Sequence, residues 1–128
     1  MSFPIEKFMT PTVHSIRSGA SVAEARVAME EHGVRHLPVL DGGQLVGMVS
    51  ARDLAIVSGI RGLNADALPV EEAMSNDVLA VTPEEPLAQV AARMAERRAG
   101  SAVVVRGERV LGIFTTTDAL RALSTLAR

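Results

Sequence analysis

Two similar stretches decide the fold of this chain: Gly47-Met48-Val49-Ser50-Ala51-Arg52-Asp53 and Gly112-Ile113-Phe114-Thr115-Thr116-Thr117-Asp118. In each, a glycine precedes two apolar residues, a hydroxyl residue, two further residues and an aspartate. The glycines and the aspartates are both 65 residues apart (112 − 47 and 118 − 53). A fixed offset of this kind indicates an internal repeat.

The same offset relates residues far outside the two motifs. The matching pairs are Met9 and Met74, Val13 and Val78, Ala23 and Ala88, Met29 and Met94, Glu31 and Glu96, Val39 and Val104, and Gly42 and Gly107. We therefore predict a first repeat at 1–63, which includes an N-terminal turn, and a second repeat at 64–128. Half-units of this size must share a core, which predicts one module with pseudo-twofold symmetry.

Composition narrows the classes of function. Of the 128 residues, 48% are hydrophobic, the mean hydropathy is +0.23, and the net charge is −2. Without a basic surplus, nucleic acid is not expected as a partner. The chain has no cysteine, which excludes disulfides and thiolate chemistry. No signal peptide or membrane-length apolar run is present, so we expect a cytoplasmic protein that does not enter a membrane.

The apolar pattern predicts the order strand, helix, strand, strand, helix in each repeat, which is an α/β (α+β) fold. In the first repeat, we expect these elements at 12–16, 22–32, 37–40, 45–49 and 51–60. In the second repeat, they are expected at 78–81, from 82–86 to about 98, 102–105, 110–115, and from 116 onward. Ser21 and Glu24 match a capping box, and Gly33 is the expected helix stop. Pro38 favours a sheet edge or a strand start. Asp41-Gly42-Gly43-Gln44 predicts a hairpin turn.

The motif itself has two interpretations. In the first, Ser50 and Thr115 are helix N-caps, and Asp53 and Asp118 favour the helix dipole from the third helical position. In the second, the free amides of the helix start attract a phosphate, and the carboxylate accepts hydrogen bonds from a ribose diol. Neighbouring valines would then offer an apolar slot for a base.

The repeat resembles the CBS-domain pair, or Bateman module. The stretches that carry the resemblance are Arg35-His36-Leu37-Pro38-Val39 with Gly47–Asp53, and Gly100-Ser101-Ala102-Val103-Val104-Val105 with Gly112–Asp118. The resemblance covers nearly the whole chain. It implies a regulatory module that binds AMP, ADP or ATP in the cleft between two repeats. S-adenosylmethionine or an NAD-type ligand is the alternative within the same family.

The resemblance also implies the residues of the site. Asp53 and Asp118 match the ribose-binding aspartate of the family, and Ser50 and Thr115 match its hydroxyl residue near the phosphates. The base-lining backbone and the remaining candidates are Thr12, Val13, His14, Arg35, His36, Pro38, Arg52, Asn76, Asp77, Val78 and Thr117. The nucleotide would be a regulatory ligand, and no catalytic cofactor is expected.

The second repeat departs from the first. It carries Ala99-Gly100-Ser101 in place of Val34-Arg35-His36, Thr117 in place of Arg52, and an acid, Asp77, beside the presumed base strand. The two clefts therefore differ in charge, and we expect one of them to bind polyphosphate nucleotides more strongly. The sequence does not identify which one.

Other classes of function remain as alternatives. The three histidines lack metal-ligand spacing, so no metal is expected. No nucleophile with a base, and no Walker-type loop, is present, so we do not expect an enzyme. A structural dimerisation module without a working nucleotide site is the main alternative, and the resemblance implies a homodimer formed through helices. A sensor would report its bound state to an unidentified effector protein.

Overall fold

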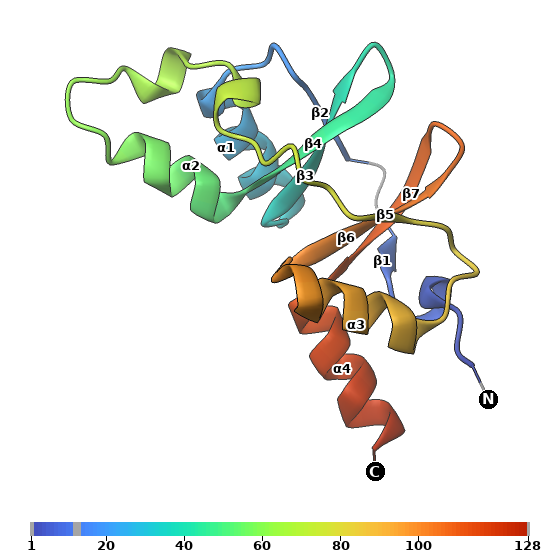
Figure 1. Cartoon of the computed structure of the whole chain (residues 1–128). Coiled ribbons are helices and arrows are strands. Elements are labelled where there is room, and N and C mark those ends of the chain that lie inside the picture. Colours follow the sequence, from blue (N-terminus) through green and yellow to red (C-terminus); the bar gives the residue numbers. More distant parts are fainter. Residues whose placement is uncertain (1, 12–13, 128) are drawn as a thin grey trace. The chain divides into compact units, whose positions relative to one another are not determined.

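The computed structural model of the chain describes residues 2–11 and 14–127. It has an α+β fold that divides into two compact units (Figure 1). The first unit is His14–Val78, and the second unit combines Met1–Val13 with Leu79–Arg128. Each unit contains one of the two motifs.

The first unit is built on a three-stranded sheet in the order β2-β3-β4. Strand β2 is parallel to β3, and β3 and β4 form an antiparallel hairpin whose two-residue turn has positive φ at Gly42 and Gly43. Glycine adopts such angles more readily than other residues, and the pairing of Asp41 with Gln44 confirms the predicted turn. The elements are β2 (Ile16–Arg17), α1 (Val22–His32), β3 (His36–Asp41), β4 (Gln44–Ser50), α2 (Ala51–Ser58), and the 3-10 turns η2 (Ala65–Ala67) and η3 (Val70–Glu72).

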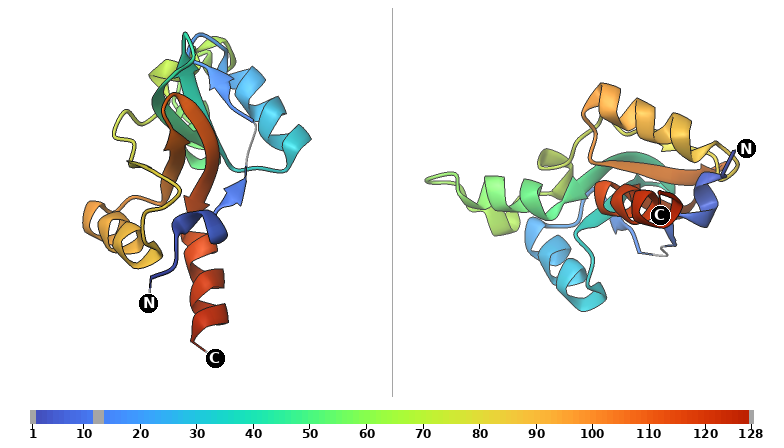
Figure 2. Two further views of the ribbon diagram at one scale, coloured as in Figure 1. Left: turned by 90° about the vertical axis from the view of Figure 1, so that its right-hand side faces the viewer. Right: turned by 90° about the horizontal axis from the view of Figure 1, so that it is seen from below.

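The second unit repeats this plan around a sheet in the order β1-β7-β6-β5. Strand β5 is parallel to β6, β6 and β7 form a hairpin, and β1 adds to the free edge of β7. The left view in Figure 2 shows α4 continuing from β7 and running out past the end of the hairpin. The elements are η1 (Ile5–Lys7), β1 (Thr10–Pro11), β5 (Ala80–Val81), α3 (Leu87–Arg97), β6 (Ser101–Arg106), β7 (Arg109–Thr115) and α4 (Thr116–Leu126).

Each unit has its own apolar core, so the single core that the sequence predicted for both half-units is not observed in the described part of the chain. In the first unit, Val22, Ala25 and Met29 of α1 pack against Leu37 and Val39 of β3. In the second unit, the corresponding cluster surrounds the fully buried Phe114. The alternation of buried and solvent-facing positions along α1 and α3 accounts for these clusters, because one face of each helix is apolar.

The opening turn of each repeat packs on the other repeat's helix start. In the second unit, the amide of Ile5 donates to the carbonyl of Glu85 at 2.8 Å. In the first unit, the matching bond joins Val70 to Ala20 at 2.7 Å. The two compact units therefore do not coincide with the predicted repeats, 1–63 and 64–128. The opening turn of each repeat belongs to the unit of the other repeat, because it is hydrogen-bonded there.

Several predicted boundaries need correction. The strand expected at 12–16 is observed only at Ile16–Arg17, and Thr12 and Val13 lie outside the described residues. The helix expected from 82–86 begins later, at Leu87, where Pro86 is the residue before the first turn. Proline lacks an amide hydrogen and therefore cannot continue a helix from preceding residues, so the helix begins directly after Pro86.

The first helix is capped as predicted, but only in part. Ser21 Oγ accepts from the amide of Glu24 at 3.0 Å. The return bond from the Glu24 side chain is not formed among the described residues, so the capping box is incomplete. Gly33 ends α1 with φ of 63°, as expected for a left-handed stop. Pro38 is the third residue of the central strand β3, so the predicted sheet edge or strand start is wrong. It precedes the two residues that pair with β2, and no sheet bond to β2 is lost there.

Candidate functional site

The first motif joins a buried strand to a capped helix. Strand β4 ends at Ser50, and its Oγ accepts from the amide of Asp53 at 3.1 Å. Asp53 Oδ2 returns the bond by accepting from the amide of Ser50 at 2.8 Å. This is a complete capping box, so the predicted N-cap role of the serine and the third-position aspartate is confirmed.

The second motif has the same local geometry. Thr115 Oγ1 accepts from the amide of Asp118 at 3.3 Å, and Asp118 Oδ2 accepts from the amide of Thr115 at 2.9 Å. Both motifs therefore place a carboxylate against the amides of a helix start. Capping and ligand binding use the same geometry, so the caps do not by themselves decide between the two interpretations.

The two aspartates differ in what occupies their second oxygen. Asp118 is only 4% exposed, and its Oδ1 accepts from Thr10 Oγ1 at 2.9 Å and faces Arg121 Nη1 at 3.4 Å. Asp53 is half-buried, and its Oδ1 has no hydrogen-bond partner in the described part of the chain. Ser75 stands 65 positions after Thr10, but its hydroxyl makes no bond to Asp53 among those residues.

The motif glycines are required by a close approach of the backbone. A Cβ at Gly47 would lie 2.8 Å from the carbonyl oxygen of Ser75, and a Cβ at Gly112 would lie 2.8 Å from that of Thr10. The sulfurs of Met74 and Met9 lie over the same two glycines and would also meet an added Cβ. The matched methionines in the sequence thus mark the segments that cross over each motif.

The basic candidates and Pro38 all belong to the first unit. Strand pairing places His36 opposite Ser50, and the carbonyl of Arg35 accepts from the amide of Ala51 at 2.8 Å. Arg35 and Arg52 are both exposed, and neither makes an ion pair within residues 2–11 and 14–127. Arg52 lies within the first motif and the backbone of Arg35 lies beside it, so two guanidinium groups without an ion pair in the described residues belong to this part of the unit.

The candidates at the presumed base strands lie outside regular strands. Asn76, Asp77 and Val78 follow Ser75, which pairs with Met48 through two backbone bonds. His14 stacks on His32, with ring centroids 3.5 Å apart and planes inclined by 11°. Thr12 and Val13 lie outside the described residues. The first unit thus gathers Ser50, Arg52, Asp53, Arg35, His36 and Asn76–Val78, and the second unit gathers Thr115, Thr117 and Asp118.

Sequence reasoning missed Thr10 and Arg121, which both contact Asp118. The bond from Thr10 spans 108 positions, so local patterns carry no information on it. One signal was available: hydroxyl residues follow the matched methionines in both repeats, as Met9-Thr10 and Met74-Ser75.

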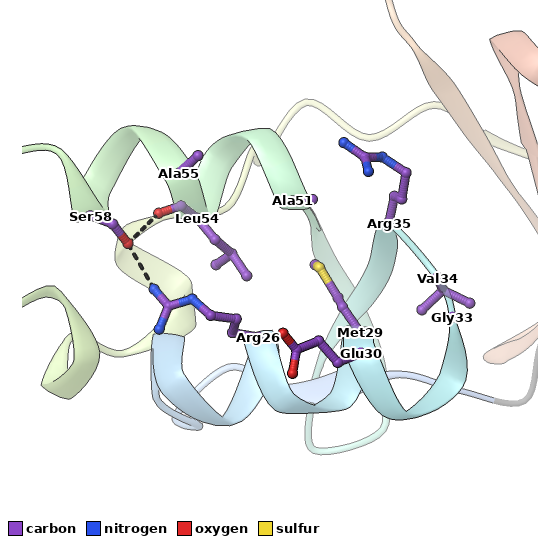
Figure 3. A pocket seen from close by; sticks show the side chains of 10 residues that line it. All are labelled: Arg26, Met29, Glu30, Gly33, Val34, Arg35, Ala51, Leu54, Ala55 and Ser58. Atoms are coloured by element: carbon purple, nitrogen blue, oxygen red, sulfur yellow. Dashed lines mark hydrogen bonds between the residues drawn. The ribbon is translucent and has the colours of Figure 1, made fainter.

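A groove of about 630 Å³ opens between α1 and α2 in the first unit (Figure 3). Arg26 closes one end by donating to Ser58 Oγ at 2.8 Å, and it also pairs with Asp66 of η2 at 2.8 Å. Met29 and Leu54 form part of the apolar wall, and Arg35 lines the opposite end. Asp53 and Ser50 do not line this groove, so it is separate from the motif carboxylate.

The described residues offer neither a metal-binding cluster nor a helix that could span a membrane. Residues 2–11 and 14–127 contain no group of three or more histidine, cysteine or acidic side chains that could hold a metal ion. Within the same residues, every helix is too short or too polar to serve as a membrane span.

The fold and the paired motifs agree with a known family. The family model of the CBS domain matches residues 5–58 and again 70–125. The chain therefore belongs to the CBS domain family, as the resemblance of its two motifs indicated, and it carries two copies of the domain.

Solved structures of CBS-domain pairs are closely similar. The CBS pair of protein MJ0100, in complex with 5-methylthioadenosine and S-adenosyl-L-methionine, is 26% identical with a TM-score of 0.85, and the match covers 98% of each chain. CBSX2 in complex with AMP is also 26% identical, with a TM-score of 0.80, and the match covers 98% of this chain and 99% of that one. Adenosyl ligands thus bind two proteins of this fold.

Curated relatives carry the same segment within longer chains. A homoserine O-acetyltransferase of Methanococcoides burtonii is 36% identical over 118 residues, which are 90% of this chain and 23% of the relative. The chain spans 13% to 24% of the length of this and three further relatives. The activities in their names belong to whole proteins of which the match is a small part.

Proposed function

We propose that this protein is a regulatory module that binds an adenine nucleotide (AMP, ADP or ATP) and passes its bound state to an effector protein. The observation that carries the proposal is the motif geometry, which places a carboxylate at the start of a helix in both units. A carboxylate oxygen suits a ribose diol, and helix amides favour phosphate.

The charges of the first unit support a phosphorylated ligand. Arg35 and Arg52 are exposed cations without an ion pair in the described residues, and His36 lies opposite Ser50 in the hairpin. In the same unit, one carboxylate oxygen of Asp53 has no hydrogen-bond partner among the residues that the structure describes. The bound states of two similar structures, one with AMP and one with S-adenosyl-L-methionine, favour an adenosyl group as the common chemistry.

Calorimetric titration with AMP, ADP, ATP, S-adenosylmethionine and NAD tests the proposal. We expect at least one adenine nucleotide to bind and to raise the melting temperature, since a ligand at a hundred times its Kd stabilises by about 2.7 kcal/mol. Guanosine monophosphate serves as the control for base selectivity. Binding of S-adenosylmethionine or NAD alone would change the ligand class, and absence of binding by all five would overturn the proposal.

A second candidate function is structural dimerisation through helices. Among the described residues, the exposed large apolar side chains lie on α1, on α4, and on α2 with the segment that follows it; they are Val27, Ile56, Ile60, Leu63, Leu120, Leu123 and Leu126. Exposed apolar side chains gathered on helices favour association between protein surfaces. Sedimentation of wild type and Leu123→Glu tests it, because a dimer formed through α4 would dissociate in the variant.

A further inference from the structure

We propose that Thr10 is an internal competitor for the second ligand site: its hydroxyl occupies the carboxylate oxygen of Asp118 that a ribose diol would need. This inference rests on the proposed nucleotide function and ranks its two motifs. It makes Asp53 the open ribose acceptor and Asp118 the closed one.

The first support is the hydrogen bonding of the carboxylate. Asp118 Oδ2 accepts from the amide of Thr115 at 2.9 Å and from Thr115 Oγ1 at 3.1 Å. Its Oδ1 accepts from Thr10 Oγ1 at 2.9 Å and faces Arg121 Nη1 at 3.4 Å. Both oxygens are therefore engaged within the chain, and a ribose must displace one of these donors.

The second support is burial. The Asp118 side chain is 5% exposed, whereas Arg121 is 74% exposed and sits at the longer distance. Thr10 belongs to β1, whose backbone pairs with β7 opposite Ile113, so its hydroxyl is held in place by the sheet. An arginine on the surface moves aside at little cost. Thr10 is also exposed, but its shorter bond goes to a charged and buried acceptor, and a ribose must break that bond.

The third support is the comparison with the first unit. Ser75 takes the place of Thr10 and pairs with Met48 in the same way that Thr10 pairs with Ile113. Its hydroxyl nevertheless makes no bond to Asp53 in the described part of the chain. The same backbone crossing thus leaves one carboxylate open and closes the other.

Ligand binding at Asp118 would consequently be coupled to the N-terminal segment. A ribose that takes Oδ1 removes the side-chain bond between β1 and α4, while the backbone pairing of β1 with β7 can remain. By linkage, any change that stabilises the bond from Thr10 to Asp118 weakens nucleotide binding at Asp118.

Calorimetric titration of AMP into Asp53→Ala and into Asp53→Ala with Thr10→Val isolates the second site. Valine keeps the shape of threonine but lacks the hydroxyl, so it leaves Oδ1 to the ligand. We expect the added Thr10→Val change to tighten AMP binding about tenfold, because hydrogen bonds to charged groups are among the stronger ones. The matched control is Ser75→Ala in an Asp118→Ala background, where no change is expected.

A nucleotide without the diol sharpens the test. Binding of 2′,3′-dideoxyadenosine monophosphate should not respond to Thr10→Val, since it offers no ribose hydroxyl to Asp118. If Thr10→Val weakens AMP binding or leaves it unchanged, Thr10 is a ligand contact or a bystander, and the inference is overturned. An equal gain for AMP and the dideoxy nucleotide would also overturn it.

Amide exchange separates this inference from the proposed function. If no nucleotide binds wild type, the proposed function fails, but the bond itself is still testable. Thr10→Val should then speed amide exchange across the Thr10–Ile113 pair, with no change across Ser75–Met48 in Ser75→Ala. Unchanged exchange at Thr10–Ile113 would show that the hydroxyl does not hold β1, which overturns the inference independently of any ligand.

Discussion

The two motifs of this protein share a backbone and differ in how their carboxylates are used. Both Asp53 and Asp118 complete a capping box at the start of a helix. In the described part of the chain, the second carboxylate oxygen of Asp53 has no hydrogen-bond partner, whereas Asp118 is buried and accepts a hydrogen bond from Thr10. A repeat can therefore preserve a local structure while its chemistry diverges through residues that lie far away in sequence.

The glycines test the part of the comparison where the two motifs agree. We expect Gly47→Ala and Gly112→Ala each to destabilise the protein by about 3 kcal/mol, because the new Cβ would lie 2.8 Å from a backbone carbonyl that has little freedom to move. Urea unfolding measures the loss. Gly19→Ala and Gly100→Ala are the controls, since nothing lies within 4 Å of either position. A loss of stability in only one of the two variants would show that the backbone crossings over Gly47 and Gly112 are not equivalent.

The aspartates test the part where the motifs differ. Asp118→Ala should cost about 2 kcal/mol, because it removes a buried acceptor from Thr10 as well as the cap. Asp53→Ala should cost about 1 kcal/mol, the usual value of a cap. Equal losses in urea unfolding would indicate that the bond from Thr10 contributes nothing to stability.

The helix ends offer a third contrast. Helix α1 ends at Gly33 with φ of 63°, but α3 ends at Arg98 with φ of 54°. A side chain in this region is strained, so Arg98→Gly should stabilise the protein by about 1 kcal/mol. Thermal unfolding checks this, with Arg98→Ala as the control that keeps the Cβ. A gain from alanine equal to that from glycine would attribute the effect to the lost charge.

The smallest effect concerns an ion pair found only in the second repeat. Glu84 accepts from Arg106, and this hydrogen bond holds the pKa of the Glu84 carboxyl below its ordinary value. Because the folded-state pKa is lowered, the stabilisation is present above the unfolded pKa and is lost as pH falls through the folded one.

An NMR titration of the Glu84 carboxyl measures this shift. We expect Arg106→Gln to raise its pKa toward the ordinary value, and the control Arg109→Gln to leave it unchanged. The pair is exposed, so we expect little effect on overall stability. A pKa that does not respond to Arg106→Gln would remove this difference between the repeats.

The sequence was sufficient for the features that depend on local chemistry. The 65-residue offset predicted the repeat, and the spacing of a hydroxyl and a carboxylate predicted both capped helices, as Ser50 and Thr115 now show. Glycines at 42 and 43 predicted the hairpin turn, because few other residues adopt positive φ.

The features that depend on long-range packing were not predictable in this way. The opening turn of each repeat is hydrogen-bonded to the segment before the first helix of the other repeat. No local pattern in the sequence specifies that Ile5 donates to Glu85. For the same reason, the sequence predicts that the two sites differ, but it does not predict the different hydrogen bonds of Asp53 and Asp118. The sequence attributes the difference between the two sites to charges such as those of Arg52, Arg35 and His36. The structure adds the hydroxyl of Thr10, which donates to Asp118.

The most direct test of the account is the tightest Kd for AMP in Asp53→Ala compared with Asp118→Ala, measured by calorimetry at one salt concentration. If Asp53 is the open ribose acceptor, Asp53→Ala should weaken the tightest site by about tenfold or more, and Asp118→Ala should leave it unchanged. The reverse order, with the tightest site lost in Asp118→Ala and kept in Asp53→Ala, would contradict the account.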